Sequence, residues 1–199
     1  IIQDAREYHE ISKLYSKIDP DIIIHLAAVS HANKSNKDPH STFDHSLRTL
    51  ENTLDFAKNP KTHVIYMSSS MVYGNFTEAT EDEELNPSGQ YSIWKIAGEE
   101  LVKEYNRTTG QDYIILRPTA VYGPLDVSDR VIGTFFRRAM ADETLYVNGK
   151  DETLDFTYVK DTASGIALAS VAKNVTGKYN ISRKKKKKIL DVANTIVKL

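Results

Sequence analysis

The chain has 199 residues, of which 40% are hydrophobic and 27% are charged, and its formal net charge at pH 7 is −1. These values are typical of a folded globular protein and give no electrostatic basis for binding nucleic acid or an anionic membrane surface. No run approaches the roughly 18 consecutive apolar residues that a membrane-spanning helix needs, and the absence of cysteine excludes disulfides and thiolate metal sites. We therefore expect a soluble, cytoplasmic protein without nucleic-acid or membrane partners.

Apolar runs and helical patterns alternate along the first part of the chain. Three short apolar runs flanked by turn residues are typical of strands buried on both faces of a parallel sheet: residues 21–27, 63–67 and 113–116. Between them, helical periodicity extends over residues 39–58 and 88–109. This alternation predicts an α/β fold with a doubly wound, parallel sheet of the Rossmann type.

The second part of the chain is less regular. Its periodicity predicts a helix over 130–141, a strand over 145–147, a helix over 161–172, a strand over 178–181 and a helix over 189–199. Lysine occupies every position from 184 to 188. Because like charges in a row repel one another and stay hydrated, we expect these lysines in a solvated turn rather than at a phosphate site.

Three segments that could bind a ligand follow predicted strands. In a parallel sheet, ligands bind beyond the carboxyl ends of the strands. Residues 25–28 include small side chains that permit close backbone approach, residues 68–74 begin with a run of serines, and residues 117–124 follow the third strand. Each segment alone is compatible with an ordinary loop, but all three are expected at the same edge of the sheet.

Tyr91 and Lys95 lie four residues apart in the second predicted helix, so both side chains project from one helical face. A lysine ammonium beside a phenol favours the phenolate, lowers the pKa of the tyrosine and makes it a usable general base near neutral pH. The hydroxyl of Ser69 could hold a substrate oxygen while a hydride leaves the same carbon. A Tyr and a Lys at this spacing are common by chance, and their position relative to the three strand ends is what indicates a catalytic site.

These motifs, in this order, resemble the extended short-chain dehydrogenase/reductase family, which includes UDP-glucose 4-epimerases and dTDP-sugar dehydratases. The resemblance runs from Ile1 to about Leu199. It implies a catalytic trio of Ser69, Tyr91 and Lys95 that acts by hydride transfer. It also implies NAD as the cofactor, with NADP not excluded, and a nucleotide sugar as the substrate.

The same resemblance implies an arrangement of domains. An NAD(P)-binding core would occupy residues 1–125, and residues 126–199 would combine further core elements with a small C-terminal substrate-binding lobe. The Gly-rich strand–helix unit that begins the family's fold, and the family's C-terminal end, would be missing from this chain. Members commonly dimerise through a four-helix bundle, which here would use the helices near 39–58 and 88–109.

The resemblance assigns two groups of binding residues. The cofactor would contact Asp4, Ala5, Leu26, Ala27, Ala28, Ser46, Tyr91, Lys95 and Pro118. The substrate would contact Ser69, Ser70, Met71 and Ala120. No metal site is implied, because the histidines are scattered without paired carboxylates at a ligand spacing.

Several positions depart from the family pattern. Ser46 replaces a cofactor-contacting Asn, Ala120 replaces a substrate-binding Asn, and Leu154 replaces an Arg that often holds the substrate diphosphate. Ser70 and Met71 stand where sugar 4,6-dehydratases carry an Asp and a Glu. Neither a serine hydroxyl nor a thioether can serve as the acid or base that dehydration requires near pH 7.

We therefore expect an NAD(P)-dependent sugar-nucleotide epimerase. One alternative is a ketone or sugar reductase of the same superfamily, which Ala120 and Leu154 favour. Another is a non-catalytic dinucleotide-binding sensor or scaffold, but such proteins usually lack the Tyr or the Lys, and both are present here. The acidic stretch 78–84 reads as a solvated loop and offers no evident replacement for the dehydratase acid and base.

Overall fold

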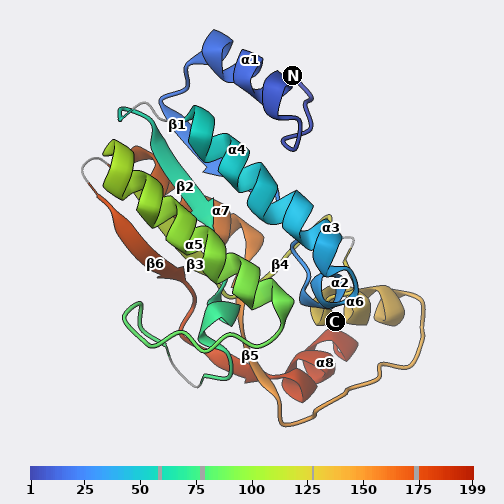
Figure 1. Cartoon of the computed structure of the whole chain (residues 1–199). Helices are drawn as coiled ribbons and strands as arrows, with labels where there is room; N and C mark the ends of the chain where they lie inside the picture. The colour runs from blue at the N-terminus through green and yellow to red at the C-terminus, as the bar shows by residue number, and fades with distance from the viewer. Residues whose placement is uncertain (58–59, 77–78, 127, 173–174) are drawn as a thin grey trace. The chain divides into compact units, whose positions relative to one another are not determined.

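The computed structural model describes residues 1–57, 60–76, 79–126, 128–172 and 175–199 (Figure 1). They form two compact units, the first comprising 1–117 and 166–180 and the second comprising 118–165 and 181–199. Residue 58, at the end of an expected helix, and Glu78, in the expected acidic loop, lie outside the described residues. The division into functional lobes near residue 125 stays a prediction and is distinct from these two units.

A four-stranded sheet forms the centre of the first unit, in the order β1-β2-β3-β6. Its strands are β1 (Ile22–His25), β2 (His63–Met67), β3 (Tyr113–Pro118) and β6 (Gly177–Ile181). β1 pairs with β2 and β2 pairs with β3 in parallel, with Ile65 in register between Ile24 and Ile114. The expected α/β fold with a parallel sheet is confirmed, because helices return the chain between strands that run in the same direction.

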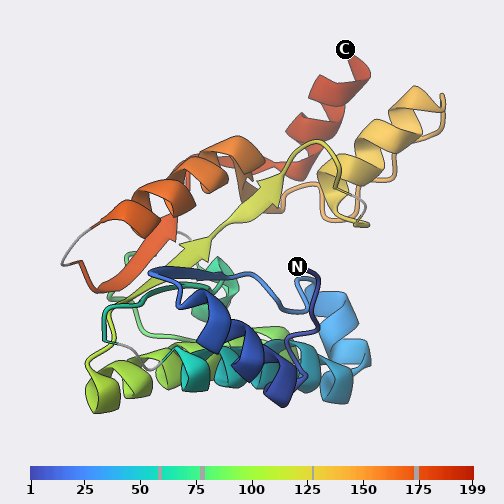
Figure 2. The same ribbon diagram turned by 90° about the horizontal axis from the view of Figure 1, so that it is seen from above.

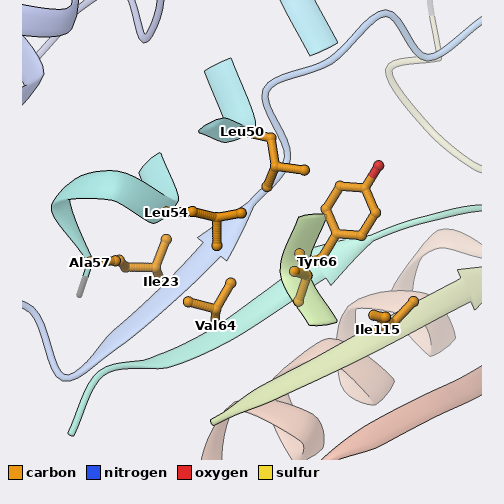
Figure 3. Close-up of a cluster of buried hydrophobic side chains, with 8 residues drawn as sticks. Ile23, Leu50, Leu54, Ala57, Val64, Tyr66 and Ile115 are labelled. Atoms are coloured by element: carbon orange, nitrogen blue, oxygen red, sulfur yellow. The ribbon is translucent and has the colours of Figure 1, made fainter. Parts of the chain in front are cut away.

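Helices of the first unit pack on one face of this sheet. α1 (Tyr8–Ile18), α4 (Thr49–Phe56) and α5 (Gln90–Thr109) cover that face, as the blue, teal and green ribbons of Figure 2 show. The core between helices and strands consists of Ile23, Leu50, Leu54, Ala57, Val64, Tyr66, Val102 and Ile115 (Figure 3). Leu50, Leu54 and Ala57 lie in the helical segment that the sequence predicts over 39–58, and Val102 lies in the one predicted over 88–109.

β1 differs from the expectation that its strand is buried on both faces. Its side chains alternate, with Ile23 and His25 buried and with Ile22 and Ile24 exposed by 41% and 42%. β1 lies at the edge of the sheet, and within the described part of this unit only the side facing α4 is packed. The central residues of β2 and β3 are buried on both faces, as expected.

The helix expected over 39–58 forms in three pieces rather than as one regular helix. α3 (Pro39–Phe43) begins it, and the Asp38 carboxylate caps it by accepting a hydrogen bond from the Ser41 amide at 3.0 Å. A π-helical turn, η1 (Asp44–Arg48), then leads into α4. α2 (Ala32–Lys37) precedes these pieces. Neither α2 nor α1 was predicted from the sequence.

The second unit contains a small mixed sheet in the order β4-β5-β7. β4 (Ala120–Tyr122) is parallel to β5 (Thr153–Tyr158), and β7 (Lys186–Lys188) is antiparallel to it. α6 (Val131–Met140) and α8 (Ile189–Val197) form where helices were expected, and α7 (Val159–Val171) passes from this unit into the first. The hydrophobic core of the second unit consists of Ile132, Phe135, Phe156, Ile189, Ala193 and Ile196.

Two predictions for this unit are wrong. No strand forms at 145–147, although Leu145 and Val147 pack inward and Tyr146 is exposed, because these residues pair with no neighbouring strand. The lysine run is exposed as expected, but only Lys184, with φ of 54°, adopts a turn conformation. Lys186–Lys188 form β7, since an edge strand leaves long charged side chains in water while its backbone pairs with β5.

Gly98 lies in the middle of α5, where glycine costs about 1 kcal/mol relative to alanine. A Cβ at Gly98 would lie 2.6 Å from Tyr66 Cζ and would collide with the Tyr66 hydroxyl, which donates to the Lys95 carbonyl at 3.4 Å. The missing side chain therefore lets α5 approach β2. None of the helices formed by the described residues is long and apolar enough to cross a membrane.

We expect Gly98→Ala to lower the free energy of unfolding by roughly 1–3 kcal/mol, as overpacking of a core does. Urea unfolding measures the change. Gly133→Ala in α6 is the matched control. A Cβ there would be close only to the flexible end of Arg137, at 3.2 Å, and would make ordinary contacts with the Asp126 and Ser128 carbonyls, so stability should stay unchanged or rise. Equal or higher stability of the Gly98 variant would show that α5 does not depend on this close approach.

Candidate active site

Lys95 is buried beside the end of β2. Its Nζ donates a hydrogen bond to the Met67 carbonyl at 2.6 Å, and only 6% of the residue is exposed. The same Nζ lies 5.4 Å from the centroid of the Tyr66 ring and 5.8 Å from that of the Tyr91 ring. Tyr91 is also buried, one helical turn before Lys95 on α5. The structure therefore brings the predicted general base and its lysine together.

The Lys95 charge persists at neutral pH despite its burial. Burial lowers the pKa of Lys95 to about 8, and the negative charge of Glu99, one turn further along α5, opposes this shift. The pKa of the neighbouring His25 is lowered to about 4 by burial and by the charge of Lys95, so this imidazole is neutral at pH 7. A cation in a low-dielectric setting acts strongly on an adjacent phenol.

Ser69 lies two residues beyond Met67, in the turn that follows β2. Its backbone is extended, and its Oγ accepts a hydrogen bond from the Met71 amide at 3.2 Å, which caps the 3₁₀ turn η2 (Ser70–Tyr73). Ser69 is buried, and η2 contacts α5. Because its oxygen accepts this bond, the hydroxyl keeps its own proton for donation to a ligand oxygen.

The other predicted substrate residues are spread over both units. Ser70 and Met71 begin η2, and the Met71 side chain is exposed. Ala120 lies on β4, in the second unit. This unit begins at Pro118, a predicted cofactor residue. Ala120 and Pro118 thus belong to a different unit from the trio, and their assigned roles stay predictions.

The predicted cofactor loop after β1 is held by α4 and its π-helical turn. Thr49 Oγ1 donates to the Ala27 carbonyl at 2.9 Å, and the Val29 amide donates to Ser46 Oγ at 3.2 Å. Interruptions of this kind in helices are frequent at functional sites. The loop residues between the strand and Val29 differ in exposure, with Leu26 and Ala27 exposed and Ala28 half-buried.

Sequence reasoning missed Thr49, although a signal for it exists. Hydroxyl side chains recur at Thr42, Ser46, Thr49 and Thr53, which is the spacing of one helical face. Thr42, Thr49 and Thr53 are buried. A polar stripe of this kind on the buried side of a helix predicts that the helix holds a neighbouring loop through side-chain hydrogen bonds.

Asn36 was also missed, and no local signal could have found it. Its Oδ1 accepts a hydrogen bond from the Gln90 amide at 3.0 Å and so caps α5 directly before Tyr91. Gly89, which precedes the helix, has φ of 83°, a conformation that favours glycine. The cap comes from α2, a distant part of the sequence, so it could not be recognised as a capping motif.

Asp4 and Ala5, expected at the cofactor, lie in the N-terminal segment before α1. Asn52 of α4 donates to the Ala5 carbonyl at 2.9 Å. The Asp4 carboxylate binds Arg6, with Arg6 Nη2 2.6 Å from Oδ2. Hydrogen bonds from the Arg6 side chain and backbone lower the pKa of Asp4 to about 2. Asp4 is therefore ionised at neutral pH, and its carboxylate could accept a hydrogen bond from the adenine amine.

The second unit contains a cavity of about 460 Å³ between α6 and β5. Val131, Phe135, Tyr146, Asn148 and Leu154 contribute to its lining. None of the described residues that line it is basic, so a diphosphate would find no cation there. Across the described ranges, no three His, Asp or Glu side chains cluster as a metal site would require.

Comparison with known families gives a match over most of the chain. The model of the NAD dependent epimerase/dehydratase family matches residues 2–182. The dTDP-glucose 4,6-dehydratase of Salmonella typhimurium is 27% identical over 98% of this chain and 61% of its own length. The UDP-glucuronate 4-epimerase 6 of Arabidopsis thaliana is 30% identical over 84% of this chain and 38% of its own length.

Solved structures agree with this match. The UDP-glucuronic acid 4-epimerase of Bacillus cereus, in complex with UDP-glucuronic acid and NAD, superposes with a TM-score of 0.90 at 29% identity, over 98% of this chain and 63% of its own. The UDP-glucose 4-epimerase of Brucella ovis, in complex with NAD, gives 0.91 at 22% identity over 100% of this chain and 68% of its own, which supports the fold alone. The chain thus spans between 38% and 68% of the length of these proteins.

Proposed function

The chain belongs to the NAD-dependent epimerase/dehydratase family, and we propose that it is a sugar-nucleotide epimerase that acts by transient hydride transfer. The observation that carries this proposal is the buried Lys95 ammonium, hydrogen-bonded to the Met67 carbonyl and facing the Tyr91 ring. Beside a phenol, a buried cation favours the phenolate. Among apolar side chains alone, the same cation would have no such role. Ser69, in the adjoining turn, would supply the hydrogen-bond donor that acts together with Tyr91 as the base.

NAD is the cofactor of this family, and the described residues at the β1 and β2 ends fit it. The exposed Ala27 offers backbone to a flat ligand, and Thr49 holds that backbone in place. Tyr91 and Lys95 would face the nicotinamide ribose, and Asp4 would accept from the adenine amine. NAD, when bound, supplies the acceptor for a hydride.

The roles of the trio follow from their chemistry. Tyr91, as phenolate, would take the proton of a substrate hydroxyl. The carbon that bears this hydroxyl would lose a hydride in the same step, which leaves a ketone. Ser69 would donate a hydrogen bond to that oxygen throughout. Lys95 would keep the phenol acidic. Return of the hydride to the opposite face, with return of the proton from Tyr91, gives the epimer without a net change in composition.

The reductase alternative rests on the second unit. Ala120 and Leu154 lack the polar groups by which family members hold a nucleotide sugar, and the described lining of the cavity beside Leu154 is free of cations. A smaller ketone or sugar would need no such cation. The sensor or scaffold alternative finds less support, because such proteins usually lack the Tyr or the Lys, whereas both are present and buried here.

We also propose a cytoplasmic homodimer formed through α3, α4 and α5. Phe43 of α3 and Ile93 of α5 are exposed by 39% and 43%, and the Phe43 ring contacts that of Trp94 at 5.8 Å between centroids. Exposed apolar side chains on two neighbouring helices are typical of a surface that is covered in an oligomer.

Incubation of the full-length protein with NAD and a panel of UDP- and dTDP-sugars tests the reaction class. We expect a product of unchanged mass and altered chromatographic retention. We expect no 4-keto-6-deoxy sugar, although several curated relatives are dehydratases, because Ser70 and Met71 offer no acid and base. Loss of water from any nucleotide sugar would exclude the epimerase subclass. Oxidation of added NADH or NADPH by a ketone or keto sugar in a parallel incubation, without epimerisation in the first, would favour the reductase.

Tyr91→Phe removes only a hydroxyl and should leave folding and NAD binding intact. We expect turnover to fall by about 10²–10⁴-fold, as loss of a general base does. Tyr105→Phe on the same helix is the control, because its hydroxyl contacts Glu51, on a different helix, at 3.4 Å and should leave turnover unchanged. Near-normal turnover of the Tyr91 variant would exclude this residue as the base.

A further inference from the structure

Glu99 and Arg117 form an ion pair in the interior of the first unit. Arg117 Nε lies 2.8 Å from one Glu99 carboxylate oxygen, and Nη2 lies 2.5 Å from the other, so the pair is bidentate. Glu99 is 0% exposed and Arg117 is 1% exposed. Burial would by itself lower the pKa of Arg117, but hydrogen bonds to Glu99 and Tyr73 raise it, so the guanidinium keeps its charge.

The pair is the centre of a larger hydrogen-bonded network. The Ser68 hydroxyl donates to Glu99 Oε1 at 2.5 Å. Arg117 Nη1 donates to the Tyr73 hydroxyl at 2.8 Å and to the Glu81 carbonyl at 3.2 Å. Each nitrogen of the guanidinium and both oxygens of the carboxylate thus have a hydrogen-bond partner, which is the condition under which buried charges are tolerated.

Stability alone does not account for this arrangement. Taking two charges out of water costs several kcal/mol per ion, and well-packed apolar residues of similar volume are often as stable or more so. What distinguishes the pair is the set of segments that it joins. Glu99 is one turn beyond Lys95 on α5, Ser68 directly precedes Ser69, and Arg117 ends the part of β3 in the first unit.

We propose that Glu99 and Arg117 are positioning residues that set the register of α5 against the turn containing Ser69, and so hold Tyr91, Lys95 and Ser69 in reacting geometry. This inference rests on the proposed function of the trio. Neither residue of the pair needs to touch the substrate. Ser68 is the direct connection, because its hydroxyl ties the Glu99 carboxylate to the residue before Ser69.

The Glu99 carboxylate also acts on the Lys95 charge. The titratable groups that face Lys95 are Tyr91 and Glu99 on its own helix, Tyr66 on β2 and His25 on β1. His25 is neutral at pH 7, and burial raises the pKa of Tyr66 well above its usual range, so it is neutral too. Among these described groups, Glu99 supplies the negative charge that raises the pKa of the ammonium. Its neutralisation should make Lys95 lose its proton at lower pH.

The test compares wild type with Glu99→Met/Arg117→Met, which replaces both charges by apolar side chains of similar length. Epimerisation is followed from pH 5 to pH 10, and the pH dependence of Lys95 acetylation is measured by mass spectrometry. We expect turnover at neutral pH to fall by about 10- to 100-fold, as small misplacements of reacting groups do. In Glu99→Gln, which removes the negative charge alone, the alkaline limb of turnover and the midpoint of Lys95 labelling should both move to lower pH.

The exposed pair of Glu104 and Arg107 on the same helix supplies the control. Glu104→Met/Arg107→Met should change neither turnover nor Lys95 labelling, because both side chains are in water. A folded Glu99/Arg117 double variant with wild-type turnover would overturn the positioning role, since a purely structural pair predicts that result.

Two further outcomes remain decisive. If the double variant does not fold, Ser68→Ala tests the connection alone, and we expect about a fivefold or greater loss of turnover from misplacement of Ser69; unchanged turnover overturns the proposal. If wild type turns over no nucleotide sugar, the proposed function fails separately. Lys95 labelling then decides the inference without any activity, because an unshifted labelling midpoint in folded Glu99→Gln contradicts it.

Discussion

The candidate site depends on a single buried cation, the ammonium of Lys95. An ammonium that leaves water needs compensation, and here the Met67 carbonyl, the faces of two aromatic rings and the Glu99 carboxylate provide it. These partners come from β2 and α5, so the position of the charge fixes how the helix lies on the sheet. Gly98 makes the same contact possible sterically, because it lets the helix backbone approach Tyr66.

The parallel sheet then determines where the chemistry can lie. β1 and β2 end at the same edge, and the loops that follow them carry Ala27 and Ser69. Both loops are held by side chains of the helices: Thr49 binds the first and Glu99, through Ser68, binds the second. The helices α4 and α5 are therefore more than a cover for the core, since each fixes one loop of the candidate site.

Sequence reasoning recovers the parts of this fold that depend on local pattern. Apolar runs predicted β1, β2 and β3, and the four-residue spacing placed Tyr91 beside Lys95. It failed where a partner distant in sequence decides the outcome, as at Leu145, whose strand-like neighbours find no partner, and at β7, whose lysines pair with β5. The ion pair of Glu99 with Arg117 was equally invisible, because nothing in either local sequence indicates the other residue.

The most direct test of this account is the titration of Tyr91 in the folded full-length protein, followed by NMR with tyrosine labelled at Cζ and assigned through Tyr91→Phe. A free tyrosine has a pKa of about 10. The account predicts a pKa for Tyr91 below that value in wild type, and an increase in Lys95→Met, where the buried positive charge is gone. The same Tyr91 pKa in both proteins would show that Lys95 does not activate the phenol and would contradict the central claim.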